Sequence, residues 1–168
     1  MRAMQSKRPR HFAIVPAAGS GSRMGSARPK QYLNLLGRPL IHHTLSVLCE
    51  SPEIDAVYVV LSVDDDEWAR HDWSALGPRL GPLFCGGDAR ADSVLGGLRA
   101  IAAEAAADDW VLVHDAARPC LAGWHVDKLV RELAHEEVGG LLAVPVADTL
   151  KRADAHRHVL ETVARDSL

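Results

Sequence analysis

The sequence predicts a Rossmann-like α/β fold, in which a mostly parallel sheet lies between layers of helices in an α/β/α arrangement. Short apolar runs alternate along the chain with longer segments of helical period, an order typical of parallel strands joined by helices. The apolar runs are nearly continuous, as expected when both faces of a sheet are covered. The 168 residues are 48% hydrophobic and 24% charged, which is ordinary for one globular domain.

Apolar runs and apolar periodicity define the expected elements. Five runs are predicted as strands: Phe12–Val15, Ala56–Leu61, Pro82–Cys85, Trp110–His114 and Leu141–Val144. Three segments are predicted as helices: Leu40–Cys49, Asp92–Ala103 and Trp124–His135. In the second helix the predicted apolar face consists of Val94, Leu95, Leu98, Ile101 and Ala102. The polar stretch after Val144 lacks a clean period, and we interpret it as a two-stranded excursion with its turn at Ala153–His156.

Charge and composition exclude several classes of protein. The net charge of −3 and pI near 6.3 give no bulk attraction for nucleic acid, so we expect no nucleic-acid partner. No apolar run approaches the 20 or so residues of a membrane span, so no membrane partner is expected. The basic N-terminal segment lacks a signal-peptide core because Pro16 ends the run Phe12–Val15, which predicts a cytoplasmic location.

The first strand runs directly into a glycine-rich loop that also carries cations, AIVPAAGSGSRMGSARPKQY from Ala13 to Tyr32. Gly19 and Gly21 allow the backbone to pass close to a ligand. Arg23 and Lys30 add positive charge at the same place, with Arg28 between them. Backbone N–H groups and cations at a strand end suit a polyphosphate and its neutralisation during reaction. The loop therefore indicates an enzyme acting on a nucleoside triphosphate.

Polar motifs also follow three later strands, and ligands of open α/β sheets bind beyond the carboxyl ends of the strands. CGGDARADS follows the third run, HDAARP the fourth and a polar segment the fifth. The candidate site residues in these motifs are Gly86, Gly87, Asp88, Asp92, Ser93, Asp115, Arg118, Thr149 and Lys151. We expect all of them to converge with the glycine loop at one edge of the sheet.

Each motif also has a structural interpretation. Gly86 and Gly87 could form only a tight turn, and Asp92 or Ser93 could serve only as a helix N-cap. Asp115 could pair with Arg118 as a structural salt bridge. Four polar loops at successive strand ends favour the functional interpretation over these separate ones.

Two familiar nucleotide motifs do not fit the glycine loop. No Gly-Lys-Ser/Thr follows at the spacing of a P-loop. A dinucleotide-binding Rossmann site needs an acidic residue about 20 residues further on, whereas the first acid after the second strand, Asp64, is much more distant. The run Asp64–Asp66 itself is interpreted as a solvated turn, since no partner cluster accompanies it.

Together the motifs resemble the sugar-phosphate nucleotidyltransferases, and most closely the 2-C-methyl-D-erythritol 4-phosphate cytidylyltransferases of non-mevalonate isoprenoid synthesis. PAAGSGSRM with PKQY, GGDARADSV, VLVHDAARPC and PVADTLKRA match that family in order and spacing, from His11 to Leu168. The resemblance implies one nucleotidyltransferase domain over residues 1–168, with a nucleotide-binding core at 11–145 and a protruding β-arm at 146–165. The family fold continues past the position of Leu168, where a lysine contacts the substrate phosphate, and this sequence has no counterpart of that part.

The resemblance also implies roles for individual residues. Arg23 and Lys30 would stabilise the transition state. CTP would be bound by Ala17, Ala18, Gly19, Gly87, Asp88, Ser93, Asp115 and Ala116, beside the Gly21 of the glycine loop. The sugar phosphate would be bound by Asp115, Arg118, Thr149 and Arg165. Asp115 would lie near Mg²⁺, and Arg165 would act catalytically from the arm of a neighbouring subunit in a homodimer formed through 146–165.

The implied reaction transfers CMP from CTP to 2-C-methyl-D-erythritol 4-phosphate, giving 4-diphosphocytidyl-2-C-methyl-D-erythritol and pyrophosphate. A phosphate monoester has a second pKa of about 6, so it attacks without a general base. Two alternatives stand beside this one: a ribitol 5-phosphate cytidylyltransferase, and a truncated, non-catalytic CTP-binding protein. Arg23 and Lys30 favour an enzyme, because a sensor has no need of transition-state charge.

Overall fold

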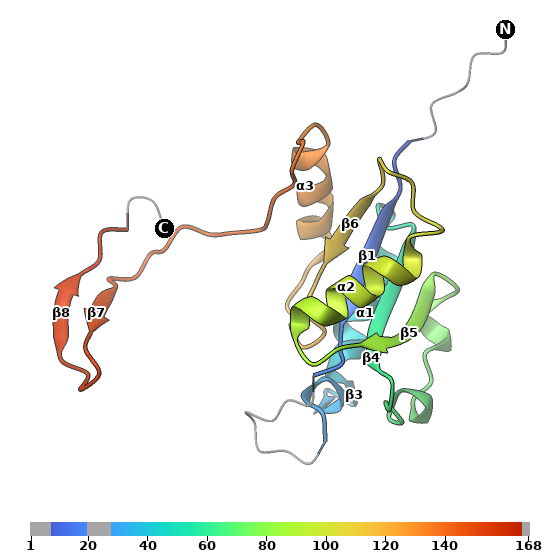
Figure 1. Cartoon of the computed structure of the whole chain (residues 1–168), viewed down its shortest axis with the longest axis horizontal. Coiled ribbons are helices and arrows are strands. Elements are labelled where there is room, and N and C mark those ends of the chain that lie inside the picture. The colour runs from blue at the N-terminus through green and yellow to red at the C-terminus, as the bar shows by residue number, and fades with distance from the viewer. Residues whose placement is uncertain (1–7, 20–27, 166–168) are drawn as a thin grey trace, which may run out of the picture. The chain divides into compact units, whose positions relative to one another are not determined.

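A computed structural model describes residues 8–19 and 28–165. Four parallel strands form its main sheet in the order β5-β4-β1-β6 (Figure 1). The strands are β1 (His11–Pro16), β4 (Ala56–Ser62), β5 (Leu80–Gly86) and β6 (Trp110–Val113). The predicted α/β class with a mostly parallel sheet is confirmed, and these four strands lie where four of the five were expected.

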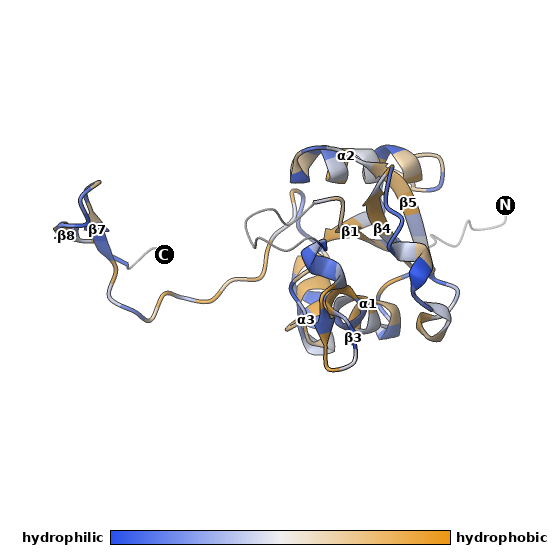
Figure 2. Ribbon diagram, turned by 90° about the horizontal axis from the view of Figure 1, so that it is seen from below, coloured by the Kyte–Doolittle hydropathy of each residue, from blue (hydrophilic) through white to orange (hydrophobic). Residues whose placement is uncertain are grey.

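Helices cover both faces of this sheet, and all three lie close to their expected positions. They are α1 (Leu40–Glu50), α2 (Arg90–Ile101) and α3 (Gly123–Leu133). Figure 2 shows α2 on one side of the sheet and α1 with α3 on the other. The side chains of β1 alternate accordingly: Ala13 and Val15 join the cluster that contains α1, whereas Phe12 and Ile14 pack with Ile101 of α2. Within the described ranges, no helix is both long and apolar enough to span a membrane.

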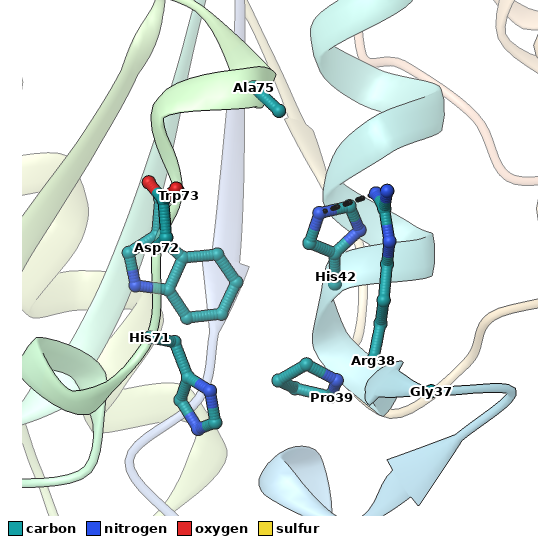
Figure 3. A pocket seen from close by; sticks show the side chains of 8 residues that line it. All are labelled: Gly37, Arg38, Pro39, His42, His71, Asp72, Trp73 and Ala75. Atoms are coloured by element: carbon teal, nitrogen blue, oxygen red, sulfur yellow. Dashed lines mark hydrogen bonds between the residues drawn. The ribbon is translucent and has the colours of Figure 1, made fainter.

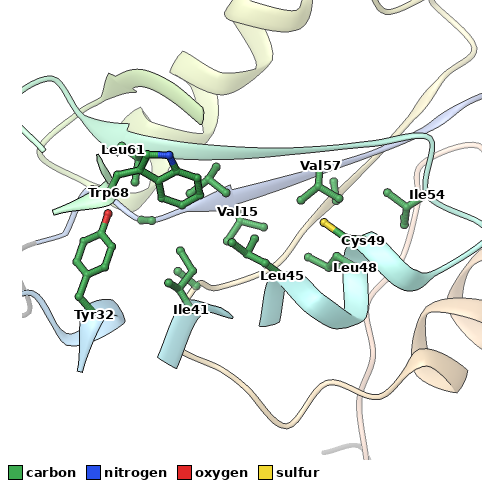
Figure 4. Packing of buried hydrophobic residues seen from close by; sticks show 14 of the residues in the cluster. Val15, Tyr32, Ile41, Leu45, Leu48, Cys49, Ile54, Val57, Leu61 and Trp68 are labelled. Carbon is green, nitrogen blue, oxygen red and sulfur yellow. The ribbon is translucent and has the colours of Figure 1, made fainter. Parts of the chain in front are cut away.

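The larger core cluster also anchors the segments that follow β1 and β4 (Figure 4). Val15 of β1 packs in one cluster with Leu45 of α1, and both are fully buried. Tyr32 and Trp68 lie outside the sheet and the long helices, yet they are only 1% and 7% exposed. Burying a large apolar side chain stabilises a fold by about 1.5–3 kcal/mol, so these connecting segments are held firmly by the core.

Several short elements occupy these connections, and the sequence patterns did not predict them. Between β1 and α1 lie the 3₁₀ helix η2 (Lys30–Tyr32) and the small antiparallel pair β2 (Asn34–Leu35) and β3 (Arg38–Pro39). Between β4 and β5 lie the 3₁₀ helices η3 (Trp68–Arg70) and η4 (Ser74–Leu76). Each is too short to produce a periodic signal.

The apolar face predicted for α2 is partly wrong. Ile101 is buried as expected, but Leu95 and Leu98 are 44% and 39% exposed. The helix instead presents Ser93 and Gly97 to the sheet. A Cβ on Gly97 would lie 2.8 Å from Cγ2 of Val60. The helix therefore packs so closely that small side chains must occupy the contact face.

The chain divides into two compact units, residues 1–132 and 133–168. The second holds the antiparallel hairpin of β7 (Lys151–Ala153) and β8 (Val159–Thr162), which confirms the predicted two-stranded excursion. The turn is fixed by Asp154, whose Oδ1 accepts hydrogen bonds from the N–H groups of His156 and His158 at 2.8 and 2.9 Å. The expected division into residues 11–145 and 146–165 stays a prediction.

The fifth predicted strand, Leu141–Val144, is wrong. This segment has no strand structure, and Leu141 and Val144 are 80% and 85% exposed. An apolar run becomes a strand only when its backbone forms hydrogen bonds with a neighbouring strand. Residues 141–144 pair with none of the described strands.

Candidate active site at the carboxyl edge of the sheet

Three of the four candidate loops meet at one edge of the main sheet. Because β1, β4, β5 and β6 are parallel, their carboxyl ends share that edge. The glycine loop follows β1, the GGDARADS segment follows β5, and the HDAARP segment follows β6. Thr149, Lys151 and Arg165 belong to the other compact unit. The described residues of these three loops therefore lie at the same edge of the sheet, and the convergence of the predicted site residues on one ligand stays a prediction.

The start of the glycine loop is held on both sides by the protein. The N–H of Ala17 donates to the carbonyl of Val60 at 2.8 Å, and the carbonyl of Ala17 accepts from Nε2 of Gln31 at 2.6 Å. Ala17 is buried, Ala18 is half-buried and Gly19 is exposed. A Cβ on Gly19 would meet no atom of the described residues within 4 Å, so among them the backbone there is open to an incoming group. Gly21 and Arg23 lie outside the described residues.

Gly86 brings the end of β5 against the glycine loop. A Cβ on Gly86 would lie 2.2 Å from the Cβ of Ala18 and 2.7 Å from the carbonyl oxygen of Leu61. Real Cβ atoms do not approach other atoms so closely. The glycine is therefore needed for packing between two site loops as well as for any approach to a ligand.

We expect Gly86→Ala to lower the free energy of unfolding by about 1–3 kcal/mol, because the added methyl group must displace Ala18 or the backbone at Leu61. Gly19→Ala is the matched control, since its methyl group enters open space. Urea unfolding of both variants measures the difference. Equal stability of the two variants would show that the loops are not packed as described.

The turn after β5 has the hydrogen bonds of a tight turn and a helix cap, and it also leaves backbone exposed where a ligand could bind. The N–H of Gly87 donates to Oγ of Ser93 at 3.2 Å, and the N–H of Ala89 donates to Oδ2 of Asp92 at 3.1 Å. Asp92 thus satisfies a backbone donor at the start of α2, as a capping residue does. Ser93 is only 3% exposed, whereas Asp88 is exposed. The loop is fixed from its buried side, and its other side faces solvent.

Asp115 is the charged centre of the described site. Its Oδ1 accepts a hydrogen bond from Nε of Arg90 at 2.7 Å, and its Oδ2 forms an ion pair with Nε of Arg118 at 2.8 Å. Burial raises the pKa of this carboxyl, but the hydrogen bond and charge of Arg90, together with the charges of Arg118 and His114, outweigh that effect and leave the pKa lowered. Asp115 is therefore ionised at neutral pH. The predicted pair with Arg118 is present, and Arg90 is an additional partner that sequence reasoning missed.

Lys30 is presented to solvent by a segment anchored in the core. Lys30 is exposed on η2, while its neighbours Gln31 and Tyr32 are 3% and 1% exposed. The Tyr32 hydroxyl donates a hydrogen bond to the carboxylate of Asp65 at 2.9 Å. Burial is the main cause that raises the pKa of Tyr32 far above its usual value, and this hydrogen bond raises it further. Oδ1 of Asp65 also accepts from the N–H of Trp68 at 2.9 Å.

This contact corrects the interpretation of the Asp64–Asp66 run as a solvated turn. Asp64 and Asp66 are exposed, but Asp65 between them is half-buried and holds Tyr32. Glu67 makes a second link, since its Oε2 accepts from Nε and Nη2 of Arg28 at 2.9 and 2.6 Å. Acidic side chains after β4 thus fix the segment that carries Lys30.

A hollow of about 230 Å³ lies between the start of α1 and the segment 71–75 (Figure 3). It is lined by Gly37, Arg38, Pro39, His42, His71, Asp72, Trp73 and Ala75. Nη1 of Arg38 lies 3.0 Å from Nε2 of His42, and Ser46 Oγ lies 3.1 Å from Nδ1 of the same ring. Burial lowers the pKa of His42, and the charges of Arg38 and His43 lower it further. The imidazole ring is therefore neutral and accepts a hydrogen bond from Arg38. Among the described residues, none of those that line this hollow is a predicted site residue.

Asp115 fits a magnesium ion that arrives with a nucleotide. The described residues contain no group of three or more His, Cys, Asp or Glu side chains able to hold a metal. Mg²⁺ is usually bound by one or two carboxylates together with substrate phosphates, and a single ionised carboxylate at the sheet edge suits that arrangement. Because Arg90 and Arg118 occupy both oxygens of Asp115, one of them would have to release its oxygen.

The hairpin unit brings Thr149 and Arg165 to one end of the hairpin. The N–H of Val163 donates to the carbonyl of Leu150 at 3.0 Å, next to both residues in sequence. The guanidinium of Arg165 donates to the carbonyl of Ala147, and both Thr149 and Arg165 are exposed. The two predicted substrate-binding residues of the arm therefore lie near the same end of the hairpin.

Comparison with known proteins identifies the family. Residues 11–168 match the family model described as 2-C-methyl-D-erythritol 4-phosphate cytidylyltransferase. The chain belongs to this family. A relative of that name from Azoarcus sp. (strain BH72) is 81% identical over 165 residues, covering 98% of this chain and 70% of the relative. Another from Aromatoleum aromaticum is 73% identical, covering 98% of this chain and 71% of the relative.

Similarity to a solved structure supports the family assignment. A crystal structure of 4-diphosphocytidyl-2C-methyl-D-erythritol synthase matches with a TM-score of 0.83 and 33% identity, covering 97% of this chain and 72% of that one. The resemblance to the 2-C-methyl-D-erythritol 4-phosphate cytidylyltransferases is confirmed, and the chain is a nucleotidyltransferase. The roles implied for its individual residues stay predictions.

Proposed function

We propose that this cytidylyltransferase moves CMP from CTP to 2-C-methyl-D-erythritol 4-phosphate, an early reaction of non-mevalonate isoprenoid synthesis. Membership of the family over residues 11–168 carries the proposal. The site supports it, because the described loops lie at the carboxyl edge of one parallel sheet, an ionised Asp115 there pairs with Arg90, and Lys30 is presented from a buried anchor. These are the parts needed to bind and neutralise a triphosphate.

The reaction is a direct displacement at phosphorus. A phosphate oxygen of the sugar phosphate forms a bond to the α-phosphorus of CTP. The bond from that phosphorus to the oxygen bridging the α and β positions breaks, and pyrophosphate leaves with the electron pair. The attacking monoester is already largely dianionic near neutral pH, so no protein base is required. Lys30 and Arg23 neutralise charge as it develops, and the CTP contacts predicted in the loops align the triphosphate.

Mg²⁺ is the proposed cofactor, held by Asp115 together with the triphosphate, where it would neutralise phosphate charge. Arg118, Thr149 and Arg165 would bind the sugar phosphate, the last two from the hairpin of a neighbouring subunit. This arrangement implies a homodimer formed through residues 146–165. The placement of Thr149 and Arg165 at one end of the hairpin supports it. We place the enzyme in the cytoplasm, where CTP is available.

A shared site predicts complementation between two inactive variants. Lys30→Ala and Arg165→Ala homodimers would each have little activity, but subunit exchange would create hybrid dimers with one intact site. We expect pyrophosphate release to recover toward about a quarter of the wild-type rate, as random mixing of subunits requires. Mass spectrometry of differently labelled subunits verifies exchange. No recovery after verified exchange would contradict the shared site.

Pyrophosphate release tests the function itself. The purified chain is incubated with CTP and Mg²⁺, with 2-C-methyl-D-erythritol 4-phosphate and ribitol 5-phosphate offered in parallel. Release with the first substrate alone supports the proposal, and release with the second alone assigns the ribitol activity. Binding of CTP without release from either would identify a non-catalytic binding protein.

A further inference from the structure

The first compact unit buries polar side chains that the proposed chemistry does not use. Apart from Ser93, which is a predicted CTP contact, the buried polar residues in the described part of the chain are Gln31, His42, Thr44 and Ser51. Gln31 and Thr44 each donate a hydrogen bond to a main-chain carbonyl of a site loop, across a long separation in sequence. Both belong to the connection between β1 and β4. This connection therefore touches two loops that approach from different strands.

Gln31 is linked to the glycine loop. Its Nε2 donates to the carbonyl of Ala17 at 2.6 Å, and the side chain is 3% exposed. The N–H of Ala17 is already bonded to Val60, so the two bonds fix both peptide planes that flank this residue. The next peptide leads to Ala18 and Gly19, where the backbone is open to a ligand. Lys30 precedes Gln31 directly on η2, so the same bond also sets the position of that cation.

Thr44 is linked to the loop that carries Asp115. Its Oγ1 donates to the carbonyl of Ala116 at 3.1 Å, and Thr44 is fully buried within α1. Ala116 itself is 4% exposed and follows Asp115 directly. A rigid helix thereby fixes the backbone beside the carboxylate, whose side chain is oriented by Arg90 and Arg118. The loop is therefore held by α1 through Thr44 as well as by the ion pairs of Asp115.

We propose that Gln31 and Thr44 are positioning residues, which separately hold the glycine loop for CTP and the Asp115 loop for both CTP and the sugar phosphate. The inference rests on the proposed function for the identity of the two ligands. A buried carbonyl that loses its donor is costly, and its loop moves to find another partner. Because the two bonds end on different loops, losing each one has a different kinetic consequence.

The test compares Gln31→Met with Thr44→Val, which remove the donors and nearly preserve size. We expect Gln31→Met to raise the Kd for CTP, measured by calorimetry without Mg²⁺, by about tenfold, and to leave the KM for 2-C-methyl-D-erythritol 4-phosphate within about twofold. We expect Thr44→Val to raise both that Kd and that KM, each by about tenfold, because Asp115 and Ala116 are predicted to contact CTP and Asp115 also the sugar phosphate. Thr44→Ser keeps the hydroxyl group and should restore KM to within about twofold of wild type.

Ser51→Ala is the matched structural control. Ser51 is as deeply buried, at 4% exposed, and its Oγ accepts from the N–H of Glu53 at 3.2 Å, ahead of the amino end of β4. It should change the thermal midpoint while leaving Kd and KM within about twofold of wild type. If Gln31→Met does not fold, Gln31→Leu replaces it, because leucine also lacks a donor and introduces no buried charge.

The outcomes separate this inference from the proposed function. Variants of Gln31 and Thr44 that change only the thermal midpoint, as Ser51→Ala does, would overturn the inference. The same pattern of changes in Kd and KM in both variants would also overturn it. A wild-type chain that binds CTP without releasing pyrophosphate would refute the proposed reaction, while the Kd of Gln31→Met would still decide its role. A wild-type chain that binds no CTP would overturn both.

Discussion

Replacing Lys30 with alanine is expected to lower kcat by about 10²–10³ while the fold survives. Removing one preorganised donor to a developing charge costs roughly 3–4 kcal/mol of barrier, by analogy with oxyanion-hole deletions. Stability should change little, because Lys30 is exposed on η2. Its segment is anchored by the neighbouring Gln31 and Tyr32, and these are unchanged.

Pyrophosphate release at saturating CTP and sugar phosphate measures this kcat. Lys128→Ala is the matched control, since Lys128 is a partly exposed lysine of α3 paired with Glu132 on the same helix. Such a surface pair contributes about 1 kcal/mol or less, so its removal should leave kcat at the wild-type value. A folded Lys30→Ala enzyme with near-normal kcat would remove Lys30 from the catalytic assignment.

The layers of the fold were predictable because their signals are local and repeated. Continuous apolar runs mark β1 and β4, which are buried on both faces, and periodicity marks the helices that cover them. Two predictions failed where a distant neighbour decides the outcome. Leu141–Val144 is apolar but has no ladder partner among the described strands, and α2 presents Gly97 to the sheet. Close packing of a helix on a sheet favours small residues, which an apolar pattern does not reveal.

The loops of the site were predictable for a different reason. Parallel strands place their carboxyl ends together, so the motifs after β1, β5 and β6 had to meet once the sheet was correct. The groups that hold these loops could not be found in this way. Thr44 reaches Ala116 from a separate helix, and Asp65 reaches Tyr32 from another connection. Arg90 could have been included among the candidate site residues, because it lies within the GGDARADS motif itself.

Asp115→Asn is expected to lower kcat/KM for the sugar phosphate by about 10² or more. The carboxamide keeps the size of the side chain but removes the negative charge between Arg90 and Arg118. Removing one partner from a charged hydrogen-bonded group costs about 2–5 kcal/mol in binding, and the proposed Mg²⁺ site loses its ligand as well. Activity should therefore require a higher Mg²⁺ concentration. Asp66→Asn, which alters an exposed carboxylate paired with Arg70, should leave both quantities unchanged.

The pH dependence of stability gives an independent check on Asp115. Its pKa is lowered in the folded protein, chiefly because Arg90 outweighs the effect of burial, so the carboxylate stabilises the fold above its unfolded pKa of about 4. That contribution is lost as pH falls below about 4 toward the folded pKa, where the proton binds. Asp115→Asn should thus be less stable than wild type to urea at pH 7, and this difference should be smaller at about pH 3. An equal stability difference at both pH values would show that the amide disturbs packing, and that the charge between Arg90 and Arg118 is not what stabilises the loop.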